Sequence, residues 1–185
     1  MTWNVLGIVG SLRAASYNRA LMRAAVELAP ADMKITVFDG IGDLPLFNGD
    51  VEAAGDPPPV QRFKQAIAAA DALLIATPEY NYGVPGLLKN AIDWGSRPPG
   101  KSAFRGKPAA IVGASMGTGG TTRAQHSLRQ SFVAVEIYAM VQPEFLLARA
   151  HDRIDVDGRL HDEKTRNALG AVLTAFSVWI ARCRR

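Results

Sequence analysis

Residues 72–76 read Ala-Leu-Leu-Ile-Ala, an apolar run in which polar and apolar residues do not alternate. A strand that is apolar on both faces needs cover on both faces, which is typical of parallel sheets flanked by helices. Four more short aliphatic runs predict further strands, at residues 5–9, 34–38, 109–113 and 137–140.

Helical patterns separate these runs, at residues 17–28, 60–70, 84–94, 122–133 and 160–182. Ser16 is a plausible N-cap for the first of them, and Pro30 lies beyond its end. Alternation of strands with helices predicts the α/β class: a doubly wound, five-stranded parallel sheet with helices on both faces. A length of 185 residues suits one such domain, spanning residues 1–185.

Composition restricts the class of partner. The hydrophobic fraction is 48% and the charged fraction 21%, as in ordinary water-soluble globular proteins. No apolar run approaches the roughly 20 residues that span a bilayer, and the first residues lack the pattern of a signal peptide. Cys183 is the only cysteine, which excludes an intrachain disulfide. We therefore expect a cytoplasmic protein that binds neither membrane nor metal.

The net charge of +4 is scattered along the chain, apart from a cluster at Arg182, Arg184 and Arg185. A solvated basic tail explains this cluster better than a nucleic-acid surface, so we expect no nucleic-acid partner. A mildly positive field would help to attract small anions.

Ligands of doubly wound sheets bind where strands end at the carboxyl edge. The first such loop, residues 10–18, reads Gly-Ser-Leu-Arg-Ala-Ala-Ser-Tyr-Asn and runs into a helix N-terminus, where unpaired N–H groups favour an anion. Its hydroxyls and Arg13 are phosphate-binding groups; alternatively, Ser16 only caps the helix and Arg13 faces water. The loop lacks the pattern G-x-G-x-x-G, so a monophosphate fits better than a pyrophosphate.

Two further loops carry ligand-type residues. In residues 77–86, two prolines and two glycines fix an irregular backbone, and Tyr80 and Tyr82 can contact an aromatic ring. The alternative for this loop is a tyrosine-capped surface turn. Residues 113–121 are rich in glycine, which lets a backbone approach a ligand closely.

Four blocks together resemble the NADPH-dependent FMN reductases, a group that includes quinone, chromate and azo-dye reductases. They are residues 10–18, 78–94, 106–108 and 115–117. The resemblance implies a flavodoxin-like fold, bound FMN, NADPH or NADH as hydride donor, and a small-molecule electron acceptor. It also implies a homodimer or homotetramer, with the helix carrying Asn90 and Asp93 and the segment 125–130 as candidate interfaces.

By resemblance, the first loop holds the FMN phosphate, the second lines the isoalloxazine largely through its backbone, and the third closes the remaining side. The implied cofactor-binding residues are Ser11, Arg13, Ser16, Tyr17, Asn18, Pro78, Glu79, Tyr80, Asn81, Tyr82, Ser115, Gly117 and Gly119. The expected reaction is a ping-pong hydride cycle that reduces quinones, flavins, azo compounds or metal oxyanions such as chromate. Because ring alignment does most of the work, we assign no catalytic side chain.

Three other functions compete with this interpretation. A flavodoxin-type electron carrier would bind flavin without turning over a substrate, but would be expected to be acidic. Residues 113–117 match the nucleophile elbow G-x-S-x-G, so Ser115 could serve a serine hydrolase, with Glu136 or Glu144 followed by His151 or His161. Residues 95–102 match the P-loop pattern, but they follow a predicted helix and contain two prolines.

Overall fold

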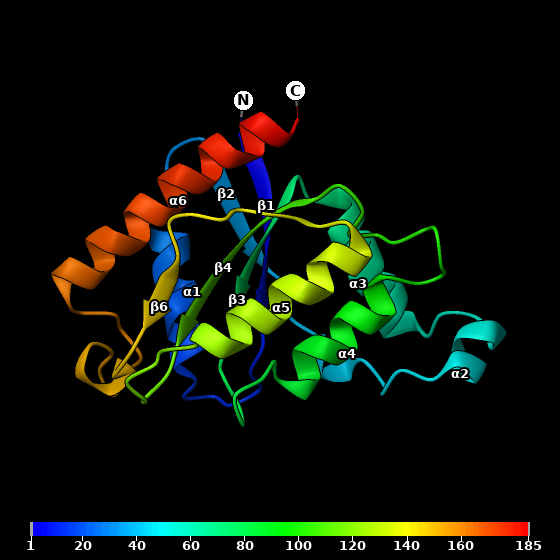
Figure 1. Ribbon diagram of the computed structural model, residues 1–185, viewed down its shortest axis with the longest axis horizontal. Coiled ribbons are helices and arrows are strands. Elements are labelled where there is room, and N and C mark those ends of the chain that lie inside the picture. The colour runs from blue at the N-terminus through cyan, green and yellow to red at the C-terminus, as the bar shows by residue number, and fades with distance from the viewer. Residues whose placement is uncertain (1, 185) are drawn as a thin grey trace.

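Parallel strands form the centre of the computed structural model, which describes residues 2–184 (Figure 1). The main strand order is β2–β1–β3–β4–β5, with β6 also paired to β4, and every strand pair is parallel. The strands are β1 (Trp3–Val9), β2 (Met33–Val37), β3 (Ala72–Ala76), β4 (Pro108–Ala114), β5 (Tyr138–Ala139) and β6 (Phe145–Leu147). This order is that of the flavodoxin-like fold, and the predicted fold class is confirmed.

Helices cover both faces of this sheet. The helices of the described residues are α1 (Tyr17–Glu27), α2 (Gly49–Ala54), α3 (Pro58–Ala69), α4 (Gly86–Gly95), α5 (Thr122–Val135) and α6 (Glu163–Cys183), with short 3-10 turns η1 (Ile41–Asp43) and η2 (Ala150–Asp152). Helices α1 and α6 pack on one face, and α3, α4 and α5 pack on the other. No helix within residues 2–184 is both long and apolar enough to cross a bilayer.

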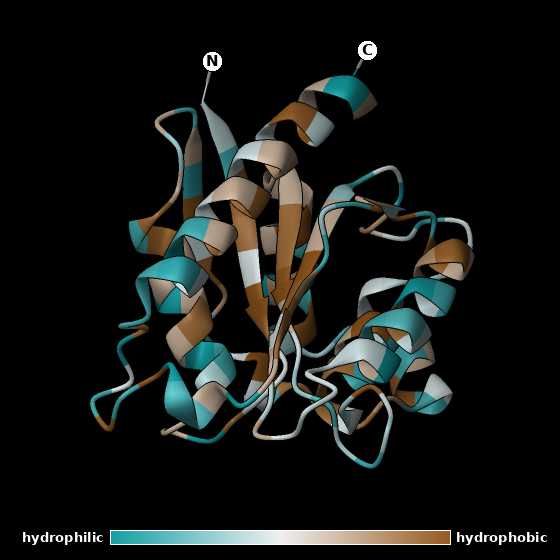
Figure 2. Cartoon of the chain, turned by 60° about the vertical axis from the view of Figure 1, so that its left-hand side comes forward, coloured by the Kyte–Doolittle hydropathy of each residue, from teal (hydrophilic) through white to brown (hydrophobic). Residues whose placement is uncertain are grey.

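The apolar run of β3 supplies both cores, as its pattern predicts. Leu74 belongs to the core beneath α1 and α6, whereas Leu73 and Ile75 belong to the opposite core. Neighbouring side chains of a strand point to opposite faces, so an unbroken apolar run is what a doubly covered strand requires. Figure 2 shows the result: largely hydrophobic strands lie between helices in which hydrophilic and hydrophobic residues are mixed.

The far edge of the sheet differs from the prediction. The expected fifth strand at 137–140 is reduced to the two residues of β5, and the same edge continues in β6, which was not predicted. Pro143 lies between the two segments and has no N–H to donate to a ladder. The edge is therefore divided: β5 pairs with the start of β4, and β6 pairs with its end.

Two helices also differ from the prediction. Helix α2 was not predicted; it is capped by Asn48, whose Oδ1 accepts from Asp50 N at 2.9 Å. Helix α6 begins at Glu163 and not at residue 160, because Asp162 serves as its N-cap. In the basic tail, Arg184 forms an ion pair with Asp71, and Arg185 lies outside the described residues.

The strand order places the candidate site. Strand β1 has β2 on one side and β3 on the other, so the chain reverses its direction of travel across the sheet between β1 and β3. Ligands of such sheets bind in the crevice outside the carboxyl ends of the strands at this reversal. The loops that leave β1, β3 and β4 meet there.

Candidate functional site

The loops after β1, β3 and β4 line one open cleft of about 890 Å³. This volume is in the range of small-molecule sites. All the binding residues implied by the resemblance line it, namely Ser11, Arg13, Ser16, Tyr17, Asn18, Pro78, Glu79, Tyr80, Asn81, Tyr82, Ser115, Gly117 and Gly119. Five further lining residues were not predicted: Ala114, Met116, Thr118, Gly120 and Arg123.

The loop after β1 brings a cation and hydroxyls to the N-terminus of α1. Among the described residues, no carboxylate lies within 4.0 Å of the Arg13 guanidinium, which is the distance that defines the ion pairs elsewhere in the chain. Ser16 Oγ caps α1 by accepting from Asn18 N at 3.2 Å and from Arg19 N at 3.4 Å. Its own hydroxyl hydrogen stays free to donate, so the cap and the anion-site interpretations are compatible.

Asn18 differs from the other polar residues of this loop in its partner. Like Ser11 and Ser16 it is buried, but its carboxamide forms two hydrogen bonds with the backbone of Ala114. Both the Asn18 oxygen and one hydrogen of its Nδ2 group are thereby occupied. One hydrogen on Nδ2 is left for any ligand.

The loop after β3 has an irregular backbone, as its prolines and glycines predict. Asn81 and Tyr82 have left-handed φ angles of 49° and 63°, which are uncommon for residues other than glycine and collect at functional sites. Tyr80 N and Gly83 N each bond to the other residue's carbonyl, at 3.3 and 3.0 Å, which closes the turn. Tyr80 and Tyr82 are exposed, so their rings are accessible to a planar ligand.

Glu79 connects this loop to α5. Its carboxylate accepts from the backbone N–H groups of Arg123 at 2.9 Å and of Ala124 at 3.0 Å, and from Arg123 Nη1 at 3.0 Å. The Arg123 guanidinium also lies over the Tyr82 ring, 4.0 Å from its centroid. Since a carboxylate already occupies the N-terminus of α5, an anionic ligand is directed to the N-terminus of α1.

The glycine-rich loop after β4 is hydrogen-bonded through its backbone to residues 147–150. Ser115 N donates to Leu147 O at 2.9 Å, Arg149 N to Gly117 O at 3.1 Å, and Ala150 N to Ser115 O at 2.9 Å. Ser115 Oγ donates to Gly120 O at 2.6 Å.

These contacts argue against the serine hydrolase. His126 pairs with Glu144 at 3.5 Å and His151 with Asp152 at 3.3 Å, and within residues 2–184 no histidine is hydrogen-bonded to Ser115. The P-loop pattern at 95–102 begins at the last residue of α4, and none of its described residues lines the cleft.

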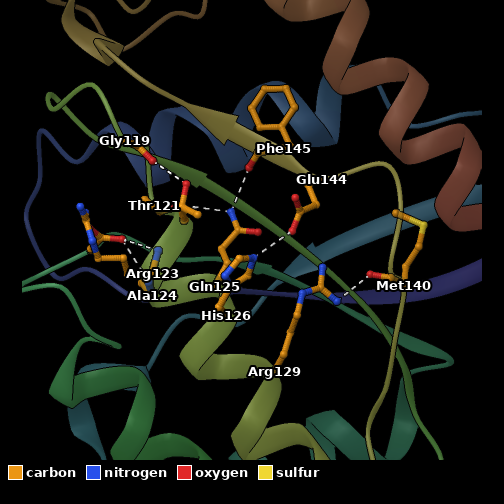
Figure 3. A network of polar contacts seen from close by, with 12 residues as sticks. Gly119, Thr121, Arg123, Ala124, Gln125, His126, Arg129, Met140, Glu144 and Phe145 are labelled. Atoms are coloured by element: carbon orange, nitrogen blue, oxygen red, sulfur yellow. Dashed lines mark hydrogen bonds and ion pairs between the residues drawn. The ribbon is translucent and has the colours of Figure 1, made fainter.

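Helix α5 is joined to the edge of the sheet below this loop (Figure 3). Gln125 Nε2 donates to Thr121 Oγ1 at 3.0 Å and to Phe145 O at 2.9 Å, and Arg129 Nη1 donates to Met140 O at 2.9 Å. Burial lowers the pKa of Arg129, and the nearby Glu144 opposes this shift. Gln125 is fully buried, so this member of the candidate interface segment points into its own chain.

Comparison with known proteins agrees with the geometry. The family model of the NADPH-dependent FMN reductases matches residues 3–152. An NAD(P)H-dependent FMN reductase of Pseudomonas aeruginosa is 51% identical over 180 residues, covering 97% of this chain and 96% of that protein. A 2-hydroxy-1,4-benzoquinone reductase of a Burkholderia species is 45% identical, with 97% of each chain covered. The solved structure of a flavoenzyme NAD(P)H:acceptor oxidoreductase from Paracoccus denitrificans superposes with a TM-score of 0.89 at 40% identity, covering 98% of each chain.

Proposed function

This chain belongs to the NADPH-dependent FMN reductase family, and from that premise we propose how its cleft performs the reaction. The protein is an FMN-dependent oxidoreductase that takes hydride from NAD(P)H and passes reducing equivalents to a small-molecule acceptor. Quinones are the proposed acceptors, because several relatives carry the name quinone reductase.

The orientation that we assign to the cofactor depends on Arg13. An arginine without a carboxylate partner, beside two serine hydroxyls at a helix N-terminus, suits a phosphate monoester. We assign the FMN phosphate to Ser11, Arg13 and Ser16. Tyr17 covers the same end of the cleft.

The flavin ring is assigned to the part of the cleft lined by residues 78–82 and by the loop containing Ser115, Gly117 and Gly119. The Glu79 carboxylate is already hydrogen-bonded to the N-terminus of α5 and to the Arg123 guanidinium. We therefore expect the flavin ring to contact backbone groups of this loop and not the Glu79 side chain.

FMN supplies the acceptance and return of hydride. The chain's own residues would hold the cofactor in a cleft that is open to solvent, where a planar substrate could reach it. Nicotinamide and acceptor would use this open cleft in turn, so a two-substrate kinetic series is expected to give parallel double-reciprocal lines. Intersecting lines would contradict the shared site. Azo compounds and free flavins are further proposed acceptors, because an open site that selects for planar rings discriminates little among them. Metal oxyanions such as chromate are not planar and are proposed on their reduction potential alone.

The test begins with the visible spectrum of protein that has been mixed with FMN and desalted. Retained flavin bands that bleach with NADPH in the absence of oxygen are the expected result. Retained bands that do not bleach would favour the electron carrier, and loss of flavin with labelling of Ser115 by a serine-directed phosphonate would favour the hydrolase.

Arg13→Ala tests the phosphate assignment. We expect FMN affinity to fall on the order of 10-fold to 100-fold, since bonds to charged groups contribute about 1.5–3 kcal/mol each. Riboflavin, which has no phosphate, should bind the variant as well as it binds the wild type. Arg62→Ala is the control, because Arg62 lies outside the cleft in an exposed pair with Asp43. Full FMN retention by Arg13→Ala would refute the assignment.

The remaining predictions concern organisation. We propose a homodimer or homotetramer, from the resemblance to the family, and light scattering on a gel-filtration column measures it directly. A single domain over residues 1–185 and a cytoplasmic location stay predictions.

A further inference from the structure

Asn18 joins two loops of the cleft that are far apart in the sequence. Its Nδ2 donates to Ala114 O at 2.9 Å, and its Oδ1 accepts from Ala114 N at 3.0 Å. Asn18 lies in the first turn of α1, whereas Ala114 is the last residue of β4. Both residues are buried, so water does not compete for either bond.

Ala114 needs this partner because β3 has already ended. Val112 O accepts from Thr77 N at 3.0 Å, and the backbone groups of alternate strand residues face the same neighbour, so those of Ala114 also face the β3 side. Strand β3 stops at Ala76, and its register with β4 ends at Val112, so no β3 residue pairs with Ala114. The Asn18 carboxamide takes the place of a backbone peptide in the ladder.

We propose that Asn18 is a positioning residue, which holds the phosphate loop and the glycine-rich loop at a fixed separation. The inference rests on the proposed function and deepens it, because it replaces the phosphate contact that the resemblance implies for Asn18. A residue that sets the separation of two walls controls the affinity for the whole flavin. A phosphate ligand controls only the affinity for its phosphate.

The first experiment compares FMN and riboflavin binding to the Asn18→Ala variant by flavin fluorescence quenching. We expect both dissociation constants to rise by the same factor, on the order of 10-fold to 100-fold. Arg13→Ala supplies the opposite pattern, in which only FMN is weakened. If Asn18→Ala weakens FMN alone, Asn18 is a phosphate ligand and the proposal is wrong.

The second experiment uses the nearly isosteric Asn18→Asp variant without flavin. An ionised aspartate could still accept from Ala114 N, but it cannot donate to Ala114 O and repels that oxygen, so we expect the paired geometry to open. A protonated aspartate can donate to Ala114 O and accept from Ala114 N. Burial raises the pKa of such a carboxyl group, so the pair should re-form on acidification. We expect protection of the Ala114 amide against hydrogen exchange, relative to wild type, to be lost at about pH 8 and recovered at about pH 5.

Other ionisable groups beside Asn18 do not explain such a response. Those that line the same cleft are Arg13, Arg123, Glu79, Tyr17, Tyr80 and Tyr82. All of them are present in wild type as well, so dividing by the wild-type protection at each pH removes their contribution.

Asn90→Asp is the matched control. Asn90 is also buried, and its carboxamide makes the same kind of double contact outside the cleft, accepting from Phe47 N at 2.8 Å and donating to Pro45 O at 2.9 Å. This variant should show the same acid recovery of stability but keep both flavin affinities within about 2-fold. Unchanged Ala114 protection in Asn18→Asp would overturn the proposal. If wild type binds no flavin, the proposed function fails, whereas the exchange experiment still reports on the Asn18–Ala114 pair.

Discussion

Gly113 in β4 gives the sharpest prediction about stability. A Cβ added there would lie 1.9 Å from Thr121 Oγ1, 2.9 Å from Thr121 Cβ and 2.7 Å from Thr77 O. Cβ atoms in real proteins essentially never approach another heavy atom within 3.0 Å, so something must move. Thr121 is fully buried and its hydroxyl is bonded to Gln125, and Thr77 O belongs to the backbone, so neither neighbour moves at low cost.

The expected cost of Gly113→Ala follows from these contacts. Overpacking a well-packed core costs about 1–3 kcal/mol. A clash with a backbone oxygen places this substitution at the upper end of that range, and displacing Thr121 from Gln125 adds about 1 kcal/mol. We therefore expect the free energy of unfolding to fall by about 3–4 kcal/mol.

Urea unfolding of the flavin-free protein, followed by circular dichroism, measures this loss. Gly86→Ala is the matched control, because a Cβ at Gly86 meets nothing within 4 Å, and its stability should change by less than about 0.5 kcal/mol. Adding Thr121→Ala to Gly113→Ala removes the shortest contact and should restore part of the loss. A Gly113→Ala protein as stable as wild type would refute the close packing of Thr121 on β4.

Three further predictions concern α6 and the helix α5 junction. Gly170→Ala should raise the free energy of unfolding by about 0.5–1 kcal/mol in urea titration, because the new methyl group meets nothing within 4 Å inside α6. Hydrogen bonds from Thr165 lower the pKa of Asp162, so its stabilisation is complete above the ordinary aspartate pKa of about 4 and is lost as the pH falls through the lower folded value. The difference in Tm between wild type and Asp162→Ala should thus be present at neutral pH and shrink in acid; a difference independent of pH would contradict the cap. Glu79→Ala should cost about 2–3 kcal/mol of unfolding free energy, whereas Arg123→Ala, which removes an exposed partner, should cost no more than about 1 kcal/mol.

The elements that the sequence predicted are those with a local signal. The apolar run at 72–76 is only five residues long and consists mostly of aliphatic residues, which favours a strand covered on both faces over a buried helix. The loops at the strand ends could also be predicted, because they are rich in glycine, proline and hydroxyl-bearing residues.

The features that the sequence did not predict depend on contacts across the fold. The three residues of β6 carry no periodicity, and they form a strand only because β4 has an open edge beyond β5. Arg123 enters the cleft because Glu79 binds it from another loop. Nothing near Asn18 in the chain identifies Ala114 as its partner, so its position in the phosphate loop predicted a ligand contact alone.

The anchoring of the glycine-rich loop by residues 147–150 has a consequence for synthesis of the protein. Chains emerge from the ribosome with the N-terminus first, so the loop after β1 is available long before Leu147 and Ala150. Until those residues arrive, the backbone of Ser115 lacks the two partners that hold it. A nascent or truncated chain therefore has the first wall of the cleft without its opposite wall. We therefore expect flavin to bind only to chains that have been translated past residue 150.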